Sequence, residues 1–160
     1  MKIRYDGPLL IVADVEAAKH FYETVLGQTV IYHKENKMVK FEVGLSLIST
    51  ISFEEWMDDD VKKIFSLSHS SHHFELYFEV DDIVACYEKL RLKPEILWLH
   101  GPSESENEQV SMRFYDLDGH VIEIGEAIAA TAKRLAAKGI PTSEISAKFS
   151  EMMWKGSRLY

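Results

Sequence analysis

The sequence predicts an α+β protein made of two βαβββ modules and a C-terminal helical tail. The first observation is a repeat, in which an apolar run, a valine, one residue and an aspartate occur at Val12–Asp14 and again at Val80–Asp82. The second is that each copy continues into an amphipathic segment and then three strand-like stretches. The third is a change to helical periodicity after Gly125. We therefore expect a paired domain over residues 1–125, with modules at about 8–50 and 73–125, and a helical extension over 126–160.

The elements of the first module follow from cap and turn signals. Asp14 can cap a helix that Gly27 would end, so a strand precedes it and a helix runs to about Leu26. The polar turn at 34–37 predicts a hairpin. The expected strands are Pro8–Ala13, Thr29–His33, Met38–Val43 and Leu45–Ser49. A short helix over Phe53–Phe65 and a loop over Ser68–Ser71 should lead to the second module.

The second module repeats this order. Asp82 can cap a helix whose apolar positions run to Leu90, and Pro94 lies beyond its end. The expected strands are His73–Val80, Glu95–Leu99, Gln109–Tyr115 and His120–Ile124, the last two joined by the turn Asp116-Leu117-Asp118-Gly119.

The tail should form two helices, over Ala127–Ala137 and from Thr142 or Ser143 to about Trp154. Its few net positive charges argue against a DNA-reading helix pair. We expect a helical hairpin packed on the body or on a partner subunit.

Composition and charge narrow the functional classes. The chain has 160 residues, of which 46% are hydrophobic and 28% charged, as expected for one globular core. No apolar signal core and no run near the roughly 18 residues of a membrane helix is present, which predicts a cytoplasmic protein without membrane partners. Cys86 cannot form an internal disulfide. The net charge of −8 disfavours nucleic acid; it would attract a cationic small molecule or simply serve solubility.

Two motifs carry a resemblance to a known family. Val12-Ala13-Asp14 leading to Phe21–Gly27 resembles the V-x-D…FY…vLG signature of the vicinal oxygen chelate superfamily. Phe114–Glu123 resembles the closing D-P-D-G-x-x-I-E strand of that family, with Leu117 in place of proline. Glyoxalase I, extradiol dioxygenases and bleomycin-resistance proteins belong to it. The resemblance implies paired modules around a cavity and a homodimer, with the modules paired either within one chain or between two.

The resemblance also implies where a metal would lie. Metal-dependent members place His or Glu ligands at four equivalent positions, which in this sequence read Gly7, Ile48, Glu75 and Glu123. Half of the ligand set is therefore absent, while divalent sites normally use three or four protein groups. We expect no cofactor. The alternative is a divalent metal held by Glu75 and Glu123 and completed by His73 or by water.

Strand alternation predicts the side chains around the cavity. Glu75 and Tyr77 share one face of their strand, and one wall should be acidic while the other is apolar. Trp98 could stack on a flat substrate or fill the core. The expected pocket residues are Leu9, Ser46, Ile48, Tyr77, Trp98 and Arg113.

Glu123 lies in an otherwise apolar strand, so its carboxylate needs a partner. If Glu75 approaches it without a cation, one of the two should have a raised pKa and could act as general acid or base. Arg113 could instead pair with Glu123, but a change of one residue in the turn would place it on the opposite face. The sequence leaves this register open.

Three hypotheses follow. The first is a small-molecule binding or sequestering protein of the bleomycin-resistance type, with an incomplete metal site and a cationic or aromatic ligand. The alternative is a metal-dependent lyase or dioxygenase with a rearranged site. The third is a regulatory or scaffolding role for the tail.

Overall fold

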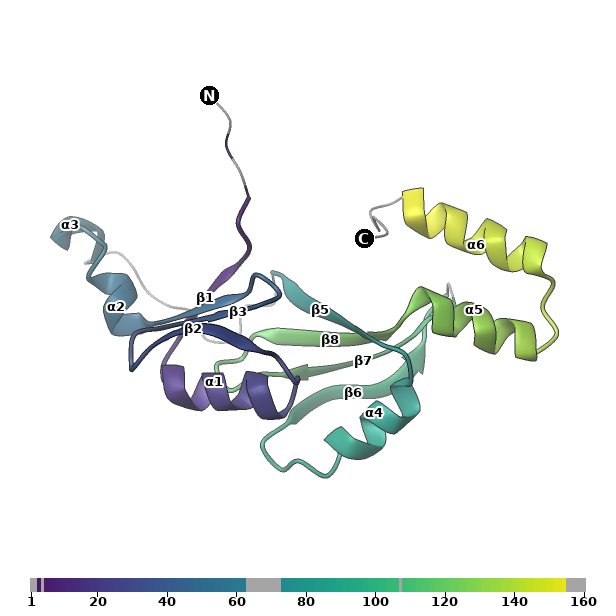
Figure 1. Ribbon diagram of the computed structural model, residues 1–160, viewed down its shortest axis with the longest axis horizontal. Coiled ribbons are helices and arrows are strands. Elements are labelled where there is room, and N and C mark those ends of the chain that lie inside the picture. The colour runs from purple at the N-terminus through teal and green to yellow at the C-terminus, as the bar shows by residue number, and fades with distance from the viewer. Residues whose placement is uncertain (1–2, 4, 63–72, 107, 155–160) are drawn as a thin grey trace. The chain divides into compact units, whose positions relative to one another are not determined.

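A computed structural model describes residues 3, 5–62, 73–106 and 108–154 (Figure 1). The chain divides into two compact units, each built around one four-stranded sheet. The first contains Met1–Phe74 with Asp116–His120, and the second contains Glu75–Tyr115 with Val121–Tyr160. The helical extension belongs to the same unit as the second module.

The first unit has the strand order β1-β4-β3-β2, with β1 (Leu9–Val12) parallel to β4 (Ser46–Ser49) and the other pairs antiparallel. Strands β2 (Val30–Lys34) and β3 (Met38–Phe41) form the predicted hairpin. Helix α1 (Val15–Thr24) packs against β4 and β3 on one face. Asp14 caps it as predicted, because its carboxylate accepts hydrogen bonds from the backbone N–H groups of Glu16 and Ala17. The buried side chains of the sheet and helix form one core.

The segment between the modules differs from its prediction. In place of one helix over Phe53–Phe65 there are two short helices, α2 (Thr50–Glu54) and α3 (Asp59–Lys62). The Ser49 hydroxyl caps α2 earlier than expected by accepting from the backbone N–H of Ser52, 3.2 Å away. Consecutive aspartates favour a new helix start rather than a helix interior, which explains the break. The end of the predicted helix and the loop Ser68–Ser71 lie outside the described residues.

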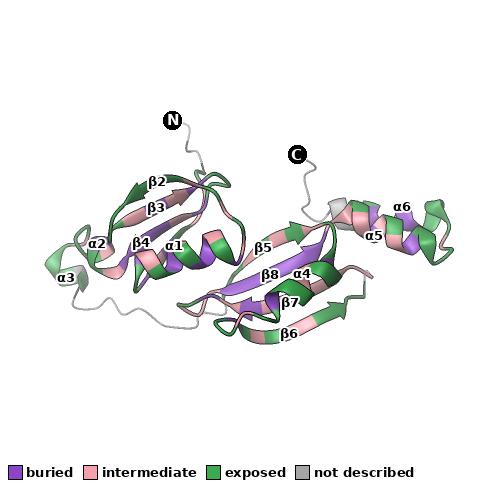
Figure 2. Ribbon diagram, turned by 60° about the horizontal axis from the view of Figure 1, so that its bottom comes forward, coloured by how far each residue is buried: buried purple, intermediate pink, exposed green. Residues whose placement is uncertain are grey.

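The second unit has the equivalent order β5-β8-β7-β6. Its elements are β5 (Glu75–Val80), α4 (Ile83–Leu90), β6 (Leu97–Glu104), β7 (Val110–Tyr115) and β8 (Val121–Glu126). Every residue of β8 is buried, and this strand lies inside the sheet between β5 and β7 (Figure 2). Helix α4 contacts β6 and β8 on one face of the sheet. The sheet therefore keeps a second face that α4 does not cover.

Strand β6 corrects another prediction, since the expected strand ended at Leu99 but continues to Glu104. Its pairing with β7 shifts register twice, between Trp98 and His100 and between His100 and Ser103. The strand is at the sheet edge, where a proline is tolerated, so Pro102 does not end it. This longer strand brings His100 and Ser103 beside β7.

The turn between β7 and β8 stabilises the first unit. Asp116 is buried, and its Oδ2 accepts a hydrogen bond from the hydroxyl of Tyr22 at 2.8 Å. Its Oδ1 accepts from the backbone N–H groups of Asp118 and His120. The carboxylate of Asp118 in turn accepts from the backbone N–H of Ala13 at 2.7 Å. The aspartates of the closing motif therefore fix the start of α1.

The extension forms the predicted helical hairpin of α5 (Ile128–Ala137) and α6 (Thr142–Trp154). Leu135, Ile145 and Phe149 form a small buried core between the two helices. Glu126, at the end of β8, accepts hydrogen bonds from the Thr131 hydroxyl at 2.9 Å and from Arg134 Nη2 at 2.8 Å. Arg134 also binds Glu104 of β6 at 3.0 Å. The extension is thereby attached to the sheet of its own unit. No helix in the described ranges is long and apolar enough to cross a membrane.

Replacing Asp116 tests the role of the turn. Asp116→Ala should lower the free energy of unfolding by about 3 kcal/mol, because the buried Tyr22 hydroxyl and two backbone donors lose their acceptor. Urea unfolding measures this change, with exposed Asp81→Ala as a control expected within about 0.5 kcal/mol of the parent. An equal effect of both substitutions would contradict this role.

Replacing Arg134 tests the attachment of the extension. Arg134→Gln should destabilise the protein by about 3 kcal/mol, because it leaves the buried Glu126 carboxylate without its cation. Hydrogen exchange of α5 should rise in the same variant. Lys133→Gln, one position earlier, serves as the control. Unchanged protection of α5 in Arg134→Gln would show that this arginine does not attach the extension.

Candidate ligand-binding site

The face of the second sheet opposite α4 is polar. Along β5, the exposed positions alternate with half-buried apolar ones, and Glu75, Tyr77 and Glu79 are all on the exposed face. Tyr77 pairs with Glu123 of β8, and Glu123 pairs with Arg113 of β7. Directly paired residues point to the same face of a sheet. The register of three strands thus collects carboxylates, an arginine and a tyrosine on one surface.

Arg113 lies between the two carboxylates predicted as a site. Its Nε donates to Glu75 Oε2 at 2.8 Å, and its Nη2 lies 3.5 Å from Glu75 Oε1. The same Nη2 donates to Glu123 Oε2 at 2.6 Å. The pairing of Arg113 with Glu123 that the sequence left open is therefore present. It exists because β7 and β8 bring these two residues directly opposite each other.

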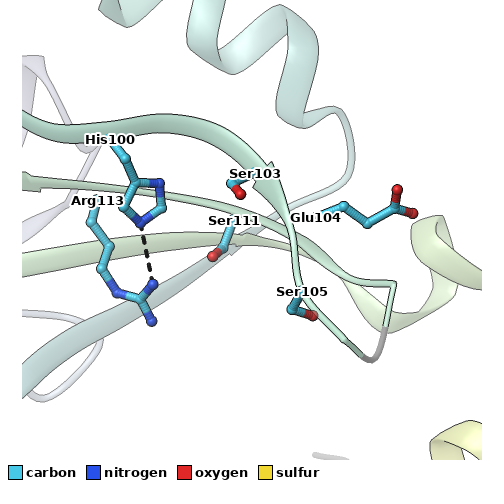
Figure 3. A pocket seen from close by; sticks show the side chains of 6 residues that line it. All are labelled: His100, Ser103, Glu104, Ser105, Ser111 and Arg113. Atoms are coloured by element: carbon cyan, nitrogen blue, oxygen red, sulfur yellow. Dashed lines mark hydrogen bonds between the residues drawn. The ribbon is translucent and has the colours of Figure 1, made fainter.

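His100 is a member of the site that sequence reasoning missed. Its Nδ1 lies 2.8 Å from the carbonyl oxygen of Gly101, which assigns the ring proton to Nδ1. Its Nε2 then accepts from Arg113 Nη1 at 3.3 Å (Figure 3). The expected strand ended at Leu99, just before His100, whereas β6 continues to Glu104. Regular alternation from Trp98 would have placed His100 on the core face, and only the register shift between these two residues brings it opposite Arg113.

The pKa values of Glu75 and Glu123 shift in opposite directions because the two carboxylates are buried to different degrees. Hydrogen bonds from Arg113 hold the pKa of Glu75 below its ordinary value of 4.5, against the opposing effect of burial. Burial, followed by the hydrogen bond with Glu75, raises the pKa of Glu123 above that value. The side chain of Glu75 is 39% exposed and that of Glu123 only 12%, which explains the opposite directions. Glu123 is the member of the pair that takes up a proton first.

Tyr77 lies on the backbone of β8. A Cβ atom at Gly125 would lie 2.4 Å from the Tyr77 hydroxyl oxygen, so only glycine leaves room for this ring. The hydroxyl accepts from Gln109 Nε2 at 2.9 Å and lies 3.3 Å from Glu79 Oε1. Burial and then the charge of Glu79 raise the pKa of Tyr77 to about 12. Tyr77 is therefore a neutral aromatic surface, 46% exposed, beside the carboxylates.

A hollow of about 190 Å³ opens beside Arg113. It is lined by His100, Ser103, Glu104, Ser105, Ser111 and Arg113. Ser103 pairs with Ser111 across β6 and β7, and the Ser111 hydroxyl hydrogen-bonds to Glu123. Glu104 points away from the other side chains (Figure 3). Its carboxylate is paired with Arg134. The hollow therefore presents hydroxyl groups, an imidazole and one guanidinium.

Two of the predicted pocket residues are corrected. Trp98 packs edge-on against Tyr87 of α4 and against Phe114, with ring centroids 5.3 Å apart in both pairs. It therefore fills the core on the helix side of the sheet. Ile48 is only 1% exposed and lies in register between Ile11 and Met38, so it is a core residue of the first sheet. Leu9 and Ser46 pair with each other in the first unit, and their place in a pocket stays a prediction.

The donor set does not fit a divalent metal as it stands. Within the described ranges, no three His, Cys, Asp or Glu side chains are grouped so that they could hold an ion. His73 is exposed and precedes β5 rather than joining Glu75 and Glu123. Gly7, at a ligand position of the family, has φ +107°, and a Cβ there would lie 2.2 Å from the carbonyl oxygen of Gly44. The backbone leaves no room for a ligand side chain at residue 7.

Comparisons with known proteins agree with the motifs. The glyoxalase-like domain family matches residues 5–129, so the chain belongs to this family and to the vicinal oxygen chelate superfamily. A solved protein of unknown function from Agrobacterium tumefaciens is 29% identical, with a TM-score of 0.66 over 79% of this chain and 96% of that one. No curated protein matches this chain.

More distant structures share the fold. A lactoylglutathione lyase from Agrobacterium tumefaciens is 21% identical, with a TM-score of 0.55 over 78% of this chain and 93% of that one. A glyoxalase/bleomycin resistance protein/dioxygenase family enzyme from Burkholderia phytofirmans is 17% identical, with a TM-score of 0.63 over 76% and 96% of the two chains. These similarities support paired βαβββ modules and leave the chemistry to the side chains.

The opposite pKa directions predict opposite effects on stability. The lowered pKa of Glu75 stabilises the folded state above pH 4.5, and this contribution is lost as the pH falls through the folded-state pKa. The raised pKa of Glu123 stabilises the folded state at acidic pH, and this contribution is lost as the pH rises through the folded-state pKa. At pH 7, Glu75→Gln should therefore lower the free energy of unfolding by about 1 kcal/mol, while Glu123→Gln should not lower it.

Urea unfolding at pH 4 and pH 7 measures both effects. Glu35→Gln, in the exposed hairpin turn, is the control. If Glu123→Gln destabilises the protein more than Glu75→Gln at pH 7, the assignment of the proton to Glu123 is wrong.

Proposed function

We propose that this protein binds a small molecule on the polar face of its second unit, and that it does so without a complete metal centre. The observation that carries the proposal is the position of Arg113 between Glu75 and Glu123, next to a hydroxyl-lined hollow. The two carboxylates that resemble metal ligands are already engaged with a protein cation. The drug-binding members of the superfamily offer the nearest functional parallel.

The chemistry of the face favours a cationic or aromatic ligand. The net charge of −8 and the carboxylates of Glu75, Glu79 and Glu123 attract cations, while one guanidinium offsets them only in part. The half-exposed ring of Tyr77 offers a stacking surface. The hollow of about 190 Å³ is smaller than the pockets that enclose a whole drug-sized molecule. We therefore expect it to accommodate one polar group of a larger ligand.

The second candidate function is that of a metal-dependent lyase or dioxygenase. Its support is the presence of Glu75 and Glu123 at the matched family positions on one face, and the fold shared with a lactoylglutathione lyase. Glu123, with its raised pKa and its contact with Ser111, could then move a proton at the edge of the hollow. This candidate requires Arg113 to leave the carboxylates. Both proposals include a homodimer, on the strength of the resemblance, and a cytoplasmic location, which is the expectation from the sequence.

Binding of indole probes tests the proposed ligand class. Tryptamine is positively charged, 3-methylindole is neutral and indole-3-acetate is negatively charged, while all three contain the same indole ring. Comparing their binding by saturation-transfer NMR therefore distinguishes the effect of ligand charge from that of ring stacking. Tryptamine should bind most tightly. Tyr77→Leu should weaken its binding about fivefold, as expected for loss of one aromatic contact. Tyr32→Leu, an exposed tyrosine of the first unit, should leave binding unchanged.

Metal content separates the two functions. Elemental analysis of untreated protein should find no stoichiometric metal, and tryptamine binding should survive treatment with EDTA. Retention of one divalent ion, together with loss of tryptamine binding after EDTA, would refute the metal-free proposal and favour the enzyme. Failure of all three indoles to bind would refute the ligand class.

A further inference from the structure

We propose that the guanidinium of Arg113 is the resident cation of this site and stands in the place of a divalent metal ion. With Arg113 in place, Glu75, Glu123 and His100 are not grouped to hold an ion, because each of them contacts the guanidinium instead. The inference rests on the proposed function and deepens it, because it says which group occupies the position between the two carboxylates of the site.

Three side chains from three strands converge on this one guanidinium. Glu75 of β5 accepts from Nε at 2.8 Å, Glu123 of β8 accepts from Nη2 at 2.6 Å, and His100 of β6 lies 3.3 Å from Nη1 through Nε2. Carboxylates and neutral imidazoles are both ligand types for zinc and other divalent ions. Each of the three donors, however, directs a lone pair at Arg113.

Arg113 and a metal ion would compete for the same lone pairs. A bound divalent ion requires donor atoms at about 2.0–2.2 Å around one point, and the guanidinium holds these donors around a group that is several atoms wide. A guanidinium cannot give up its charge at any accessible pH, so it would also repel the ion. Removing it from the carboxylates would leave Glu123, with a side chain only 12% exposed, uncompensated. The native side chain therefore excludes the ion.

His100 makes this set differ from the ligand positions of the family. It comes from the bulged part of β6, and its Nδ1–H is fixed by the carbonyl of Gly101. That hydrogen bond leaves Nε2, the atom a metal would need, directed at the guanidinium. The imidazole is thus held by the backbone on one side and by the guanidinium on the other.

The same geometry gives Arg113 a role toward a ligand. Its side chain is 35% exposed and borders the hollow, so part of the guanidinium faces the space that a ligand would enter. A carbonyl or hydroxyl oxygen of the ligand can accept a hydrogen bond there. Arg113 would then orient that oxygen through a fixed charge, as a metal ion does in other sites.

Zinc binding to the full-length protein tests the inference. Isothermal titration with zinc chloride should show only weak binding to the parent protein. Arg113→Met should bind one zinc ion about thirtyfold more tightly or better, and adding Glu123→Gln to this variant should remove the gain. Arg91→Met, which removes an exposed arginine paired with Glu88, is the matched control and should bind zinc as the parent does.

Arg113→Gln is a second variant with a polar side chain, to be used if the methionine variant does not fold, as judged by circular dichroism. No gain over Arg91→Met in a folded Arg113 variant overturns the inference, and so does tight stoichiometric zinc binding by the parent. Tryptamine binding by the parent is measured in parallel. If it persists while the Arg113 variants gain no zinc affinity, the inference fails and the proposed function stands.

Discussion

The polar face of the second unit depends on one register, in which Arg113 of β7 lies directly opposite Glu123 of β8. Glu123 is in a strand that is buried along its whole length, where an unpaired carboxylate would be costly. The guanidinium makes that position tolerable and at the same time engages Glu75 and His100. A shift of one residue would place Arg113 among the apolar side chains under α4 and leave both carboxylates unpaired.

The two modules share one topology but carry different side chains on their open faces. In the first, the matched positions are Gly7, whose backbone has no room for a side chain, and Ile48, which is buried. In the second, the matched positions are two carboxylates held by an arginine. The two sheets therefore share one strand order, while in the described part of the chain the carboxylates paired with Arg113 are on the second sheet. The extension is attached to that copy through Glu126 and Arg134 and reaches the rim of the hollow at Glu104.

Much of the fold could be predicted because its signals are local. Asp14 and Asp82 cap their helices, and Gly27 follows α1 with a positive φ, as the sequence indicates. The errors arose where tertiary context decides. Because β6 lies at the sheet edge, it continues past Pro102, and a register shift between Trp98 and His100 places His100 opposite Arg113. No local sequence pattern indicates either feature.

The site was predicted only in part. Glu75, Tyr77 and Glu123 share a face, as alternation and the resemblance suggested. The partner of Glu123 depended on the length of a turn and could not be chosen from the sequence, because both outcomes give an acceptable hairpin. The pairing of Arg113 with Glu123 is therefore the feature of the site that only the structure could give.

The most direct test of the pairing between Arg113 and the two carboxylates is NMR of the parent protein, in which the chemical shift and the exchange rate of the Arg113 Nε–H proton are measured. A guanidinium held between two carboxylates should give a slowly exchanging, downfield signal that stays unchanged when excess zinc is added. A signal that exchanges as fast as that of exposed Arg91, or that disappears as zinc binds, would contradict the account.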